Sequence, residues 1–270
     1  MSLITERNNG PESTGSEFIS KLPLITAGYW VIKICATTLG ETGADHLSMT
    51  MNVGYAVSSL IFIVVFLITL FFQLYSKKFN PVIYWLVFTS TSVAGTAISD
   101  FMDRTLGLGY AVGSLVLIIL LTITLTAWYL SESSLSVTNI KTLKGETFYW
   151  IGFLIANTLG TALGDFLADD SGLGFAGGAI LISALLGLTL TAHYLTRISS
   201  IVLFWIAFVL TRPFGATFGD LLTKTPDQGG LGIGTMGTSL ILSSLLIIFV
   251  FNSWIKQKGT EDNIEFLREE

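Results

Sequence analysis

The chain has 270 residues, of which 51% are hydrophobic and 12% charged, whereas an ordinary soluble domain has roughly 25% charged residues. Folding in water would expose far more apolar surface than a soluble monomer tolerates, so the composition predicts an all-α integral membrane protein in a lipid bilayer. The formal net charge of −5 without a basic patch excludes nucleic acid as a partner, and the single cysteine, Cys35, excludes a disulfide framework and a multi-cysteine metal site.

Eight apolar windows along the chain are each long enough to cross a bilayer as a helix, for which about 20 mostly apolar residues suffice. They lie at residues 24–45, 53–75, 81–101, 107–130, 148–168, 172–195, 200–222 and 231–254. We therefore expect eight transmembrane helices. The chain divides into a polar N-terminus (1–21), helices 1 to 4 (22–130), a linker (131–147), helices 5 to 8 (148–254) and a charged tail (255–270).

Lysine and arginine are distributed unevenly between the two sides of the predicted bundle. Ten of them fall in segments on the side of the N-terminus, whereas Arg104 and Lys224 alone fall on the opposite side. Because positively charged loops stay in the cytoplasm and eight spans return the chain to its starting side, both termini are expected to be cytoplasmic. Residues 1–21 lack an apolar run after a basic start, so we expect no cleavable signal peptide.

A fourfold internal repeat underlies this series of helices. An aromatic residue followed by tryptophan recurs at residues 29–30, 84–85, 149–150 and 204–205. A glycine follows each tryptophan after ten residues, and an aspartate follows it after fifteen. The tryptophans are Trp30, Trp85, Trp150 and Trp205, the glycines are Gly40, Gly95, Gly160 and Gly215, and the aspartates are Asp45, Asp100, Asp165 and Asp220. Four matches at two fixed offsets indicate a true repeat.

Each unit continues past its aspartate into the glycine-containing start of a second helix, so we interpret it as a two-helix hairpin. Because a hairpin contains an even number of spans, all four units cross the membrane in the same direction, as parallel repeats about an axis along the membrane normal. The interval from Asp100 to Asp165 is 65 residues rather than 55, which suggests two four-helix halves joined by a linker. We expect a pseudo-fourfold or a two-plus-two bundle whose odd-numbered helices share one environment.

With this pattern the chain resembles the bacterial integral membrane proteins that consist of four tandem repeats of unknown function, each with two transmembrane segments and a tryptophan. The resemblance covers about residues 24–254, which is nearly the whole membrane part. It implies the same organisation of the fold and a location in the bacterial inner membrane. It implies no activity, so the function has to be argued from the residues.

The four aspartates of the repeat are predicted to meet inside the bundle. Fifteen helical residues span about 22 Å, so a tryptophan at the cytoplasmic interface places its aspartate in the outer part of the bilayer. Acidic side chains within spans are costly, and they face a bundle interior or an aqueous cavity. The same helix faces carry further oxygen-bearing side chains four and seven residues earlier. These are Glu41, Thr96, Thr161, Thr38 and Thr158.

The repeats differ from one another at positions that carry charge. Glu41 stands where the other repeats have threonine or alanine, and Lys33 stands where they have phenylalanine. Arg212 takes the place of a threonine, a serine and Asn157, and His46 follows only the first of the motif aspartates. The differences favour an asymmetric transport site over a fourfold-symmetric pore. Asn157 is then a supporting polar residue, and the three basic residues serve in coupling or charge pairing.

Carboxylate and carbonyl oxygens are the ligands that hard cations prefer. Glu41 and the four motif aspartates outnumber the in-span cations Lys33 and Arg212 by three when all are ionised. Such a cluster attracts a cation, and repulsion between like charges favours proton uptake by one carboxyl group. We therefore expect a proton or a divalent metal ion to bind at Glu41 and the aspartates, and no other cofactor.

The leading hypothesis is a transporter for a cation, with a divalent metal ion such as manganese as substrate and proton-coupled export as mechanism. The alternatives are a proton-coupled carrier of a small organic cation or polar solute, and a non-transporting interaction subunit docked through the charged tail. A simpler interpretation of the aspartates is helix capping, or pairing with Arg104 and Lys224 at the outer surface. No phosphate loop, nucleophile triad or zinc-protease motif occurs, so we do not expect an enzyme. The expected partners are the bilayer and a small cation or proton, and oligomerisation is left open.

Overall fold

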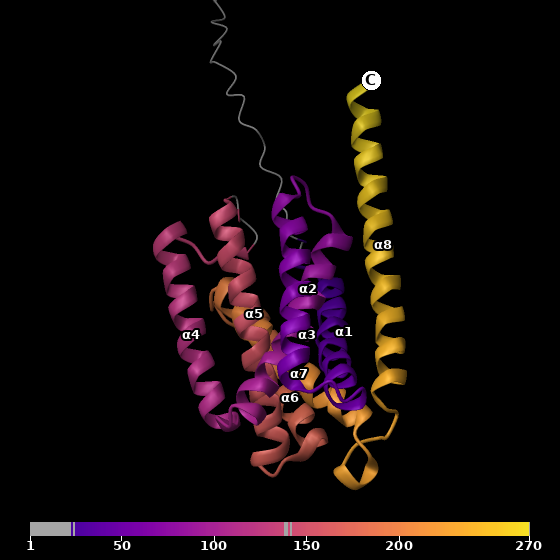
Figure 1. The fold of residues 1–270 in the computed structure, drawn as a ribbon. Helices are drawn as coiled ribbons and strands as arrows, with labels where there is room; N and C mark the ends of the chain where they lie inside the picture. The colour runs from indigo at the N-terminus through magenta and orange to yellow at the C-terminus, as the bar shows by residue number, and fades with distance from the viewer. Residues whose placement is uncertain (1–22, 24, 138–139, 141, 270) are drawn as a thin grey trace, which may run out of the picture.

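The computed structural model describes residues 23, 25–137, 140 and 142–269, and within them the chain is all-helical without strands. Figure 1 shows the long helices. They are α1 (Ala27–Asp45), α2 (Tyr55–Tyr75), α3 (Pro81–Asp100), α4 (Gly109–Glu132), α5 (Leu143–Asp165), α6 (Gly174–Leu195), α7 (Ser200–Thr223) and α8 (Thr235–Glu269). Seven of these eight are long and apolar enough to cross a membrane. Helix α1 is the exception, because its charged and threonine side chains lower its hydropathy.

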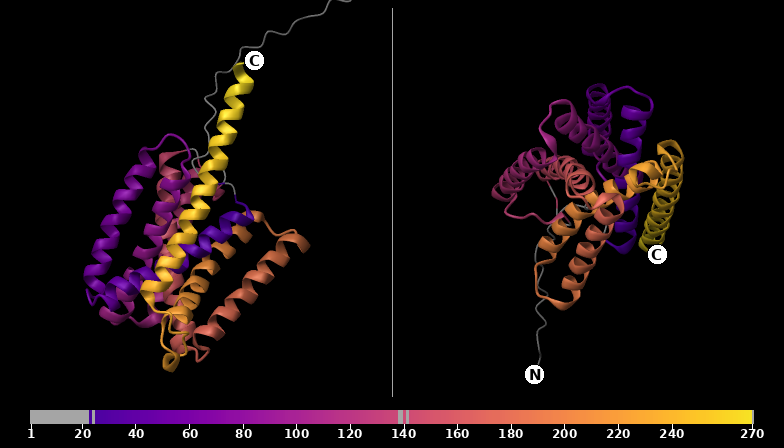
Figure 2. Two further views of the ribbon diagram at one scale, coloured as in Figure 1. Left: turned by 90° about the vertical axis from the view of Figure 1, so that its right-hand side faces the viewer. Right: turned by 90° about the horizontal axis from the view of Figure 1, so that it is seen from below.

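The odd-numbered helices form a closed ring at the centre of the molecule. Helix α1 packs against α3, α3 against α5, α5 against α7, and α7 returns to α1. In the view from below in Figure 2, the helices lie in pairs around this centre. Helix α3 contacts α5 across the linker in the same way as α1 contacts α3. Of the two expected arrangements, pseudo-fourfold and two-plus-two, the structure therefore has the pseudo-fourfold one.

Odd-numbered and even-numbered helices have different surroundings. Between 50 and 67% of the most apolar stretch is buried in α3, α5 and α7, compared with 11 to 28% in α2, α4, α6 and α8. The even-numbered helices are also the more apolar, with mean hydropathies of 1.9 to 2.6 against 1.4 to 1.7. The odd-numbered helices therefore share a protein interior, and the even-numbered helices expose leucine, isoleucine and phenylalanine side chains on the outside of the bundle.

The structure differs from the expected two-helix hairpins in one respect: the two helices of a repeat do not pack mainly against each other. Each even-numbered helix packs instead on the odd-numbered helix of the next repeat: α2 on α3, α4 on α5, α6 on α7 and α8 on α1. The connection after the aspartate carries the chain sideways to this neighbour. Every repeat is thus completed by the preceding one, and we expect the four repeats to fold as a single unit.

The glycine that follows each tryptophan by ten residues permits a close approach between neighbouring helices of the ring. A Cβ atom at Gly40 would lie 2.6 Å from the Ser92 side chain, and one at Gly95 would lie 2.9 Å from Asn157. At Gly215 the nearest atom, on Thr37, would be 2.7 Å away, and Gly160 meets Arg212 in the same way. The four contacted residues occupy one equivalent position, seven residues after the tryptophan, so one steric rule sets all four helix contacts.

Replacing Gly95 with valine is expected to lower stability by about 1–3 kcal/mol, the usual cost of overpacking a tight core. The added Cβ would also lie 2.9 Å from the backbone nitrogen of Thr158, which cannot turn away as a side chain can. Gly187→Val on α6 is the matched control, because nothing lies within 4 Å of a Cβ there. Thermal unfolding in detergent measures both variants. Equal unfolding midpoints would contradict the steric rule.

The ends of the odd-numbered helices follow a shared pattern in the first three repeats. Threonine or asparagine caps start three of them: Thr26 accepts a hydrogen bond from the amide of Tyr29, Asn80 from Val82, and Thr142 from the helix start of α5. At the other end, a π-helical turn directly follows the aspartate in the first three repeats. These turns are η1 (His46–Thr50), η2 (Phe101–Thr105) and η4 (Phe166–Asp170). Such turns are rare and often mark functional sites.

The fourth repeat departs from this pattern. Helix α7 continues past its aspartate to Thr223, and a 3₁₀ turn, η5 (Pro226–Gln228), leads to α8. Helix α8 then runs as one helix through the charged tail and projects beyond the other helices (Figures 1 and 2). The linker expected at 131–147 is shorter, because α4 reaches Glu132 and α5 begins at Leu143. The predicted polar N-terminus, 1–21, lies outside the described residues.

Candidate functional site

Side chains spaced four residues apart on the odd-numbered helices form four layers inside the ring, and each is at most 4% exposed. The first layer, nearest the chain termini, holds Lys33, Phe88, Phe153 and Phe208. The second holds Thr37, Ser92, Asn157 and Arg212, and the third holds Glu41, Thr96, Thr161 and Ala216. The fourth layer consists of the motif aspartates Asp45, Asp100, Asp165 and Asp220. The helices run unbroken from tryptophan to aspartate, so the aspartates lie at the far end of the ring.

Two basic residues cover the aspartate layer. Arg104 Nε lies 2.9 Å from Asp100 Oδ1, and its Nη2 lies 3.3 Å from Asp165 Oδ2. Lys224 Nζ lies 2.7 Å from Asp45 Oδ2 and 3.2 Å from Asp220 Oδ1. The Arg104 and Lys224 side chains are 32% and 21% exposed, whereas the four carboxylates are at most 6% exposed. These two side chains therefore stand between the acidic layer and the surroundings.

Arg104 and Lys224 occupy the same position in alternate repeats, four residues after the motif aspartate. Each pairs with the aspartate of its own repeat and with that of the next repeat, which gives the layer an approximate twofold symmetry. The pairing was among the interpretations open from the sequence, but neither basic residue was predicted to belong to the site. The signal that identifies them is the four-residue spacing between aspartate and base, which places both on one helix face.

Lys224 follows the last residue of α7, and its ammonium group is held in the charged form. Partial burial works against the charge, but the carboxylates of Asp220 and Asp45 outweigh it and raise the pKa of Lys224 above its ordinary value. Lys224 thus behaves as a permanent cation at neutral pH, tethered to the chain and bound by two carboxylates.

Glu41 and Arg212 form the centre of the third layer. Arg212 Nη2 lies 3.3 Å from Glu41 Oε2, and both side chains are at most 4% exposed. The guanidinium also donates to the carbonyl oxygens of Thr37 (2.8 Å) and Ser92 (3.2 Å), and to the hydroxyl groups of Thr96 and Thr161. Thr96 donates to Glu41 Oε2 at 3.1 Å. One buried ion pair therefore ties all four odd-numbered helices together.

The first layer closes the other end of the ring with aromatic rings around a lysine. Phe153 and Phe208 have ring centroids 3.9 Å apart, and Phe88 lies edge-on at 5.7 Å from Phe153. Lys33 Nζ lies 3.9 Å from the centroid of Phe208, donates to its carbonyl oxygen at 2.9 Å, and hydrogen-bonds to Thr211. The packed rings leave the polar layers separated from the side of the termini.

The oxygen atoms of one group of residues are arranged closely enough for a metal ion. Ligand oxygens of Glu41, Asp45 and Asp220 all lie within 4.8 Å of one another, and all three residues are buried. Carboxylates alone make up this set, which suits a hard divalent cation. Lys224 already binds two of the three carboxylates, so a metal ion and the ammonium group compete for them. Asp100 Oδ2 is buried without a hydrogen-bond partner among the described residues.

Four other residues singled out from the sequence make no hydrogen bond to these three carboxylates within the residues that the structure describes. Thr158 donates to the carbonyl oxygen of Leu154 in its own helix, and Thr38 is buried without a hydrogen-bond partner in the described part of the chain. Asn157 donates to Thr91 at 3.0 Å, in the second layer. His46 Nδ1 lies 3.1 Å from Thr235 Oγ1, at the start of α8. Seven residues along a helix is two turns, which places Thr38 and Thr158 too far from the aspartates to touch them.

The comparison with known families agrees with the fourfold packing. The family described as "Repeat of Unknown Function (DUF347)" matches the chain four times, at residues 28–79, 83–134, 148–199 and 203–258. The chain belongs to this family. The resemblance inferred from the tryptophan repeat is thereby confirmed. No curated protein and no solved structure matches the chain.

The DUF347 repeats thus supply a common scaffold on which the site residues vary. Each of the four matched segments begins shortly before its tryptophan and contains the glycine and the aspartate. Glu41 and Lys33 belong to the first repeat alone, Arg104 to the second, and Arg212 and Lys224 to the fourth. The repeat therefore accounts for the ring and the aspartates, whereas the charge pairs are specific to single repeats.

Proposed function

We propose that this protein is a membrane transporter for a cation, with a divalent metal ion such as manganese as its substrate. The single observation that carries the proposal is the convergence of five buried carboxylates, those of Glu41 and the four motif aspartates, at one end of a helix ring. Burial of a carboxylate is costly unless a positive partner is present. A mobile cation that enters this layer supplies such a partner.

Lys224, one of the two basic residues that cover the aspartate layer, suggests how the transport step proceeds. A substrate cation that reaches Glu41, Asp45 and Asp220 replaces Lys224 at its carboxylates, and the lysine swings toward the surroundings, where 21% of its side chain is already exposed. When the substrate leaves, Lys224 returns and the carboxylates are again neutralised. Exchange between a free and a tethered cation avoids an empty, repelling cluster in the low-dielectric interior.

The three layers between the aspartates and the side of the chain termini define the rest of the path of the cation. The polar second and third layers continue toward the side of the termini, and the aromatic first layer closes it there. Alternating access therefore requires that Phe88, Phe153 and Phe208 separate while the outer end closes. Glu41 is the candidate proton carrier, since Arg212 can hold it ionised and the neighbouring threonine hydroxyls can also hydrogen-bond its protonated form. We propose that the protein lies in a bacterial inner membrane with both termini on the cytoplasmic side.

Flux of Mn²⁺ into vesicles that contain the purified protein tests the proposal. Glu41→Gln and Asp100→Asn each remove one charge at nearly constant shape, and we expect each variant to lose most of the flux. Asp227→Asn, at an exposed position in η5, is the matched control and should transport like the wild type. Unchanged flux in both site variants, or no flux by the wild type with any divalent or monovalent cation, would refute the assignment.

A further inference from the structure

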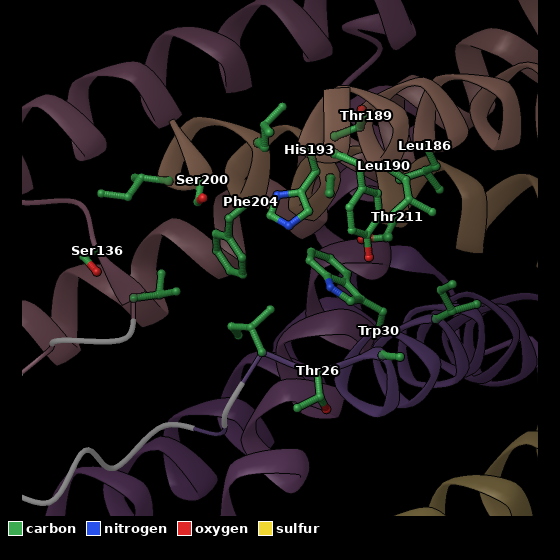
Figure 3. Close-up of a pocket in the computed structure, with 18 of the residues that line it drawn as sticks. Thr26, Trp30, Ser136, Leu186, Thr189, Leu190, His193, Ser200, Phe204 and Thr211 are labelled. Carbon is green, nitrogen blue, oxygen red and sulfur yellow. The ribbon is translucent and has the colours of Figure 1, made fainter. Parts of the chain in front are cut away.

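A second site lies on the side of the chain termini, away from the acidic layer. A cavity of about 680 Å³ opens between α1, α6, α7 and residues 135–137. Figure 3 shows Trp30, Phe204 and His193 converging on it, with Thr211 at one end. Its lining is mainly apolar, with a few hydroxyl groups and one imidazole, and its volume falls in the range of small-molecule sites.

The pseudo-fourfold symmetry shows what fills the equivalent space elsewhere. Helix α4 packs on α5 as α6 packs on α7, and Trp128 on α4 is 1% exposed. Its ring lies edge-on at 6.4 Å from Tyr149 and 6.0 Å from Trp205. Rotation by one repeat places Phe204 in the position of Tyr149 and Trp30 in that of Trp205.

The residue of α6 that corresponds to Trp128 is His193, 65 residues later, the same interval that separates Asp100 from Asp165. His193 is exposed, whereas Trp128 is buried. The smaller imidazole does not fill the space that the indole takes in the preceding repeat. The Trp30 and Phe204 rings, whose centroids are 5.8 Å apart, therefore border a cavity where their counterparts contact an indole.

We propose that this cavity binds a small, flat aromatic molecule. Its aromatic ring takes the place that the Trp128 indole occupies in the preceding repeat. Edge-to-face contact with Trp30 and Phe204 supplies the apolar recognition. The hydroxyl groups of Thr189 and Ser200 and the imidazole of His193 lie along the lining and can hydrogen-bond to a polar substituent (Figure 3). Bulk, flatness and one polar group define the ligand class.

The site stands independently of cation transport, but it borders the inner closure of the ring. Thr211 lines the cavity and also hydrogen-bonds to Lys33 of the first layer. A ligand seated against Thr211 thus contacts the residue that holds Lys33 between the phenylalanine rings. An effect of ligand on transport is not needed for the test, which measures binding alone.

Equilibrium dialysis of radiolabelled indole against the purified full-length protein in lipid nanodiscs tests the proposal. His193→Trp places an indole where Trp128 stands in the other repeat, so it should fill the cavity and weaken indole binding at least tenfold. Trp128→His is the reciprocal variant: it should open a second cavity of the same kind and raise the number of indole molecules bound. Ala207→Trp narrows the same cavity from α7 and replaces the first variant if that one does not fold.

Saturable binding by the wild type that His193→Trp or Ala207→Trp weakens at least tenfold, with thermal unfolding unchanged, supports the site. Wild-type affinity in both folded variants would overturn it. Indole binding that occurs in detergent and disappears in nanodiscs would also overturn it, because a lipid chain would then be the occupant.

Discussion

Replacing Lys224 with methionine is expected to tighten Mn²⁺ binding about tenfold or more. The ammonium group lies 2.7 Å from Asp45 and 3.2 Å from Asp220, and with Glu41 these residues hold oxygens within 4.8 Å of one another. Removal of the tethered cation frees the carboxylates of Asp45 and Asp220 next to Glu41, and a tenfold gain needs only about 1.4 kcal/mol of the lost repulsion. Methionine suits the position, since Met49 is its counterpart in the first repeat. Isothermal titration with Mn²⁺ at neutral pH measures the affinity.

The thermal stability of this variant gives a second readout. Without metal, its unfolding midpoint should fall below that of the wild type, because the carboxylates are then unpaired in the interior. Added Mn²⁺ should restore it, since a ligand that binds only the folded state stabilises that state.

Arg104→Met is the matched control for Lys224→Met. It frees Asp100 and Asp165, but the third-layer side chains next to them are threonines, so only two carboxylates become available there. Its gain in Mn²⁺ affinity should therefore be clearly smaller. Equal gains in the two variants, or no gain in Lys224→Met, would show that Lys224 does not compete for a cation site.

The fold was predictable from the sequence because the chain consists of a regular repeat of long apolar segments. Long apolar windows give the helices, and the spacing of tryptophan, glycine and aspartate gives the common orientation of the odd-numbered ones. The exchange of partners between repeats was not predictable. It depends on the path of the short connections after each aspartate, where η1, η2 and η4 form π-helical turns that no residue pattern announces.

The site was predictable in its carboxylates and not in its cations. Glu41 and the aspartates are conspicuous because acidic residues are rare within apolar helices. Arg104 and Lys224 fall outside the predicted site, since a charged residue at a helix end is ordinarily solvated. Their role depends on a partner in the next repeat, and that partner is known only once the ring is closed.

Exchange of Arg212 for asparagine is expected to destabilise the protein by about 3–5 kcal/mol, because it leaves Glu41 buried without its charge partner. Asparagine is the residue of the third repeat at this position, Asn157, so the backbone environment accepts it. Glu41→Thr introduces the residue type of Thr96 and Thr161, and it should cost a similar amount, since it leaves Arg212 unpaired. Thermal unfolding in detergent should show each single variant lowered by on the order of 10 °C.

The double variant Glu41→Thr with Arg212→Asn separates stability from function. Removing both members of a buried ion pair often restores most of the stability that either single change loses, so its unfolding midpoint should approach that of the wild type. Its Mn²⁺ flux should nevertheless be absent, because Glu41 is one of the three clustered carboxylates. A double variant that transports normally would reduce Glu41 and Arg212 to a structural pair. One that is as unstable as the sum of the single changes would show that they do not act as a pair at all.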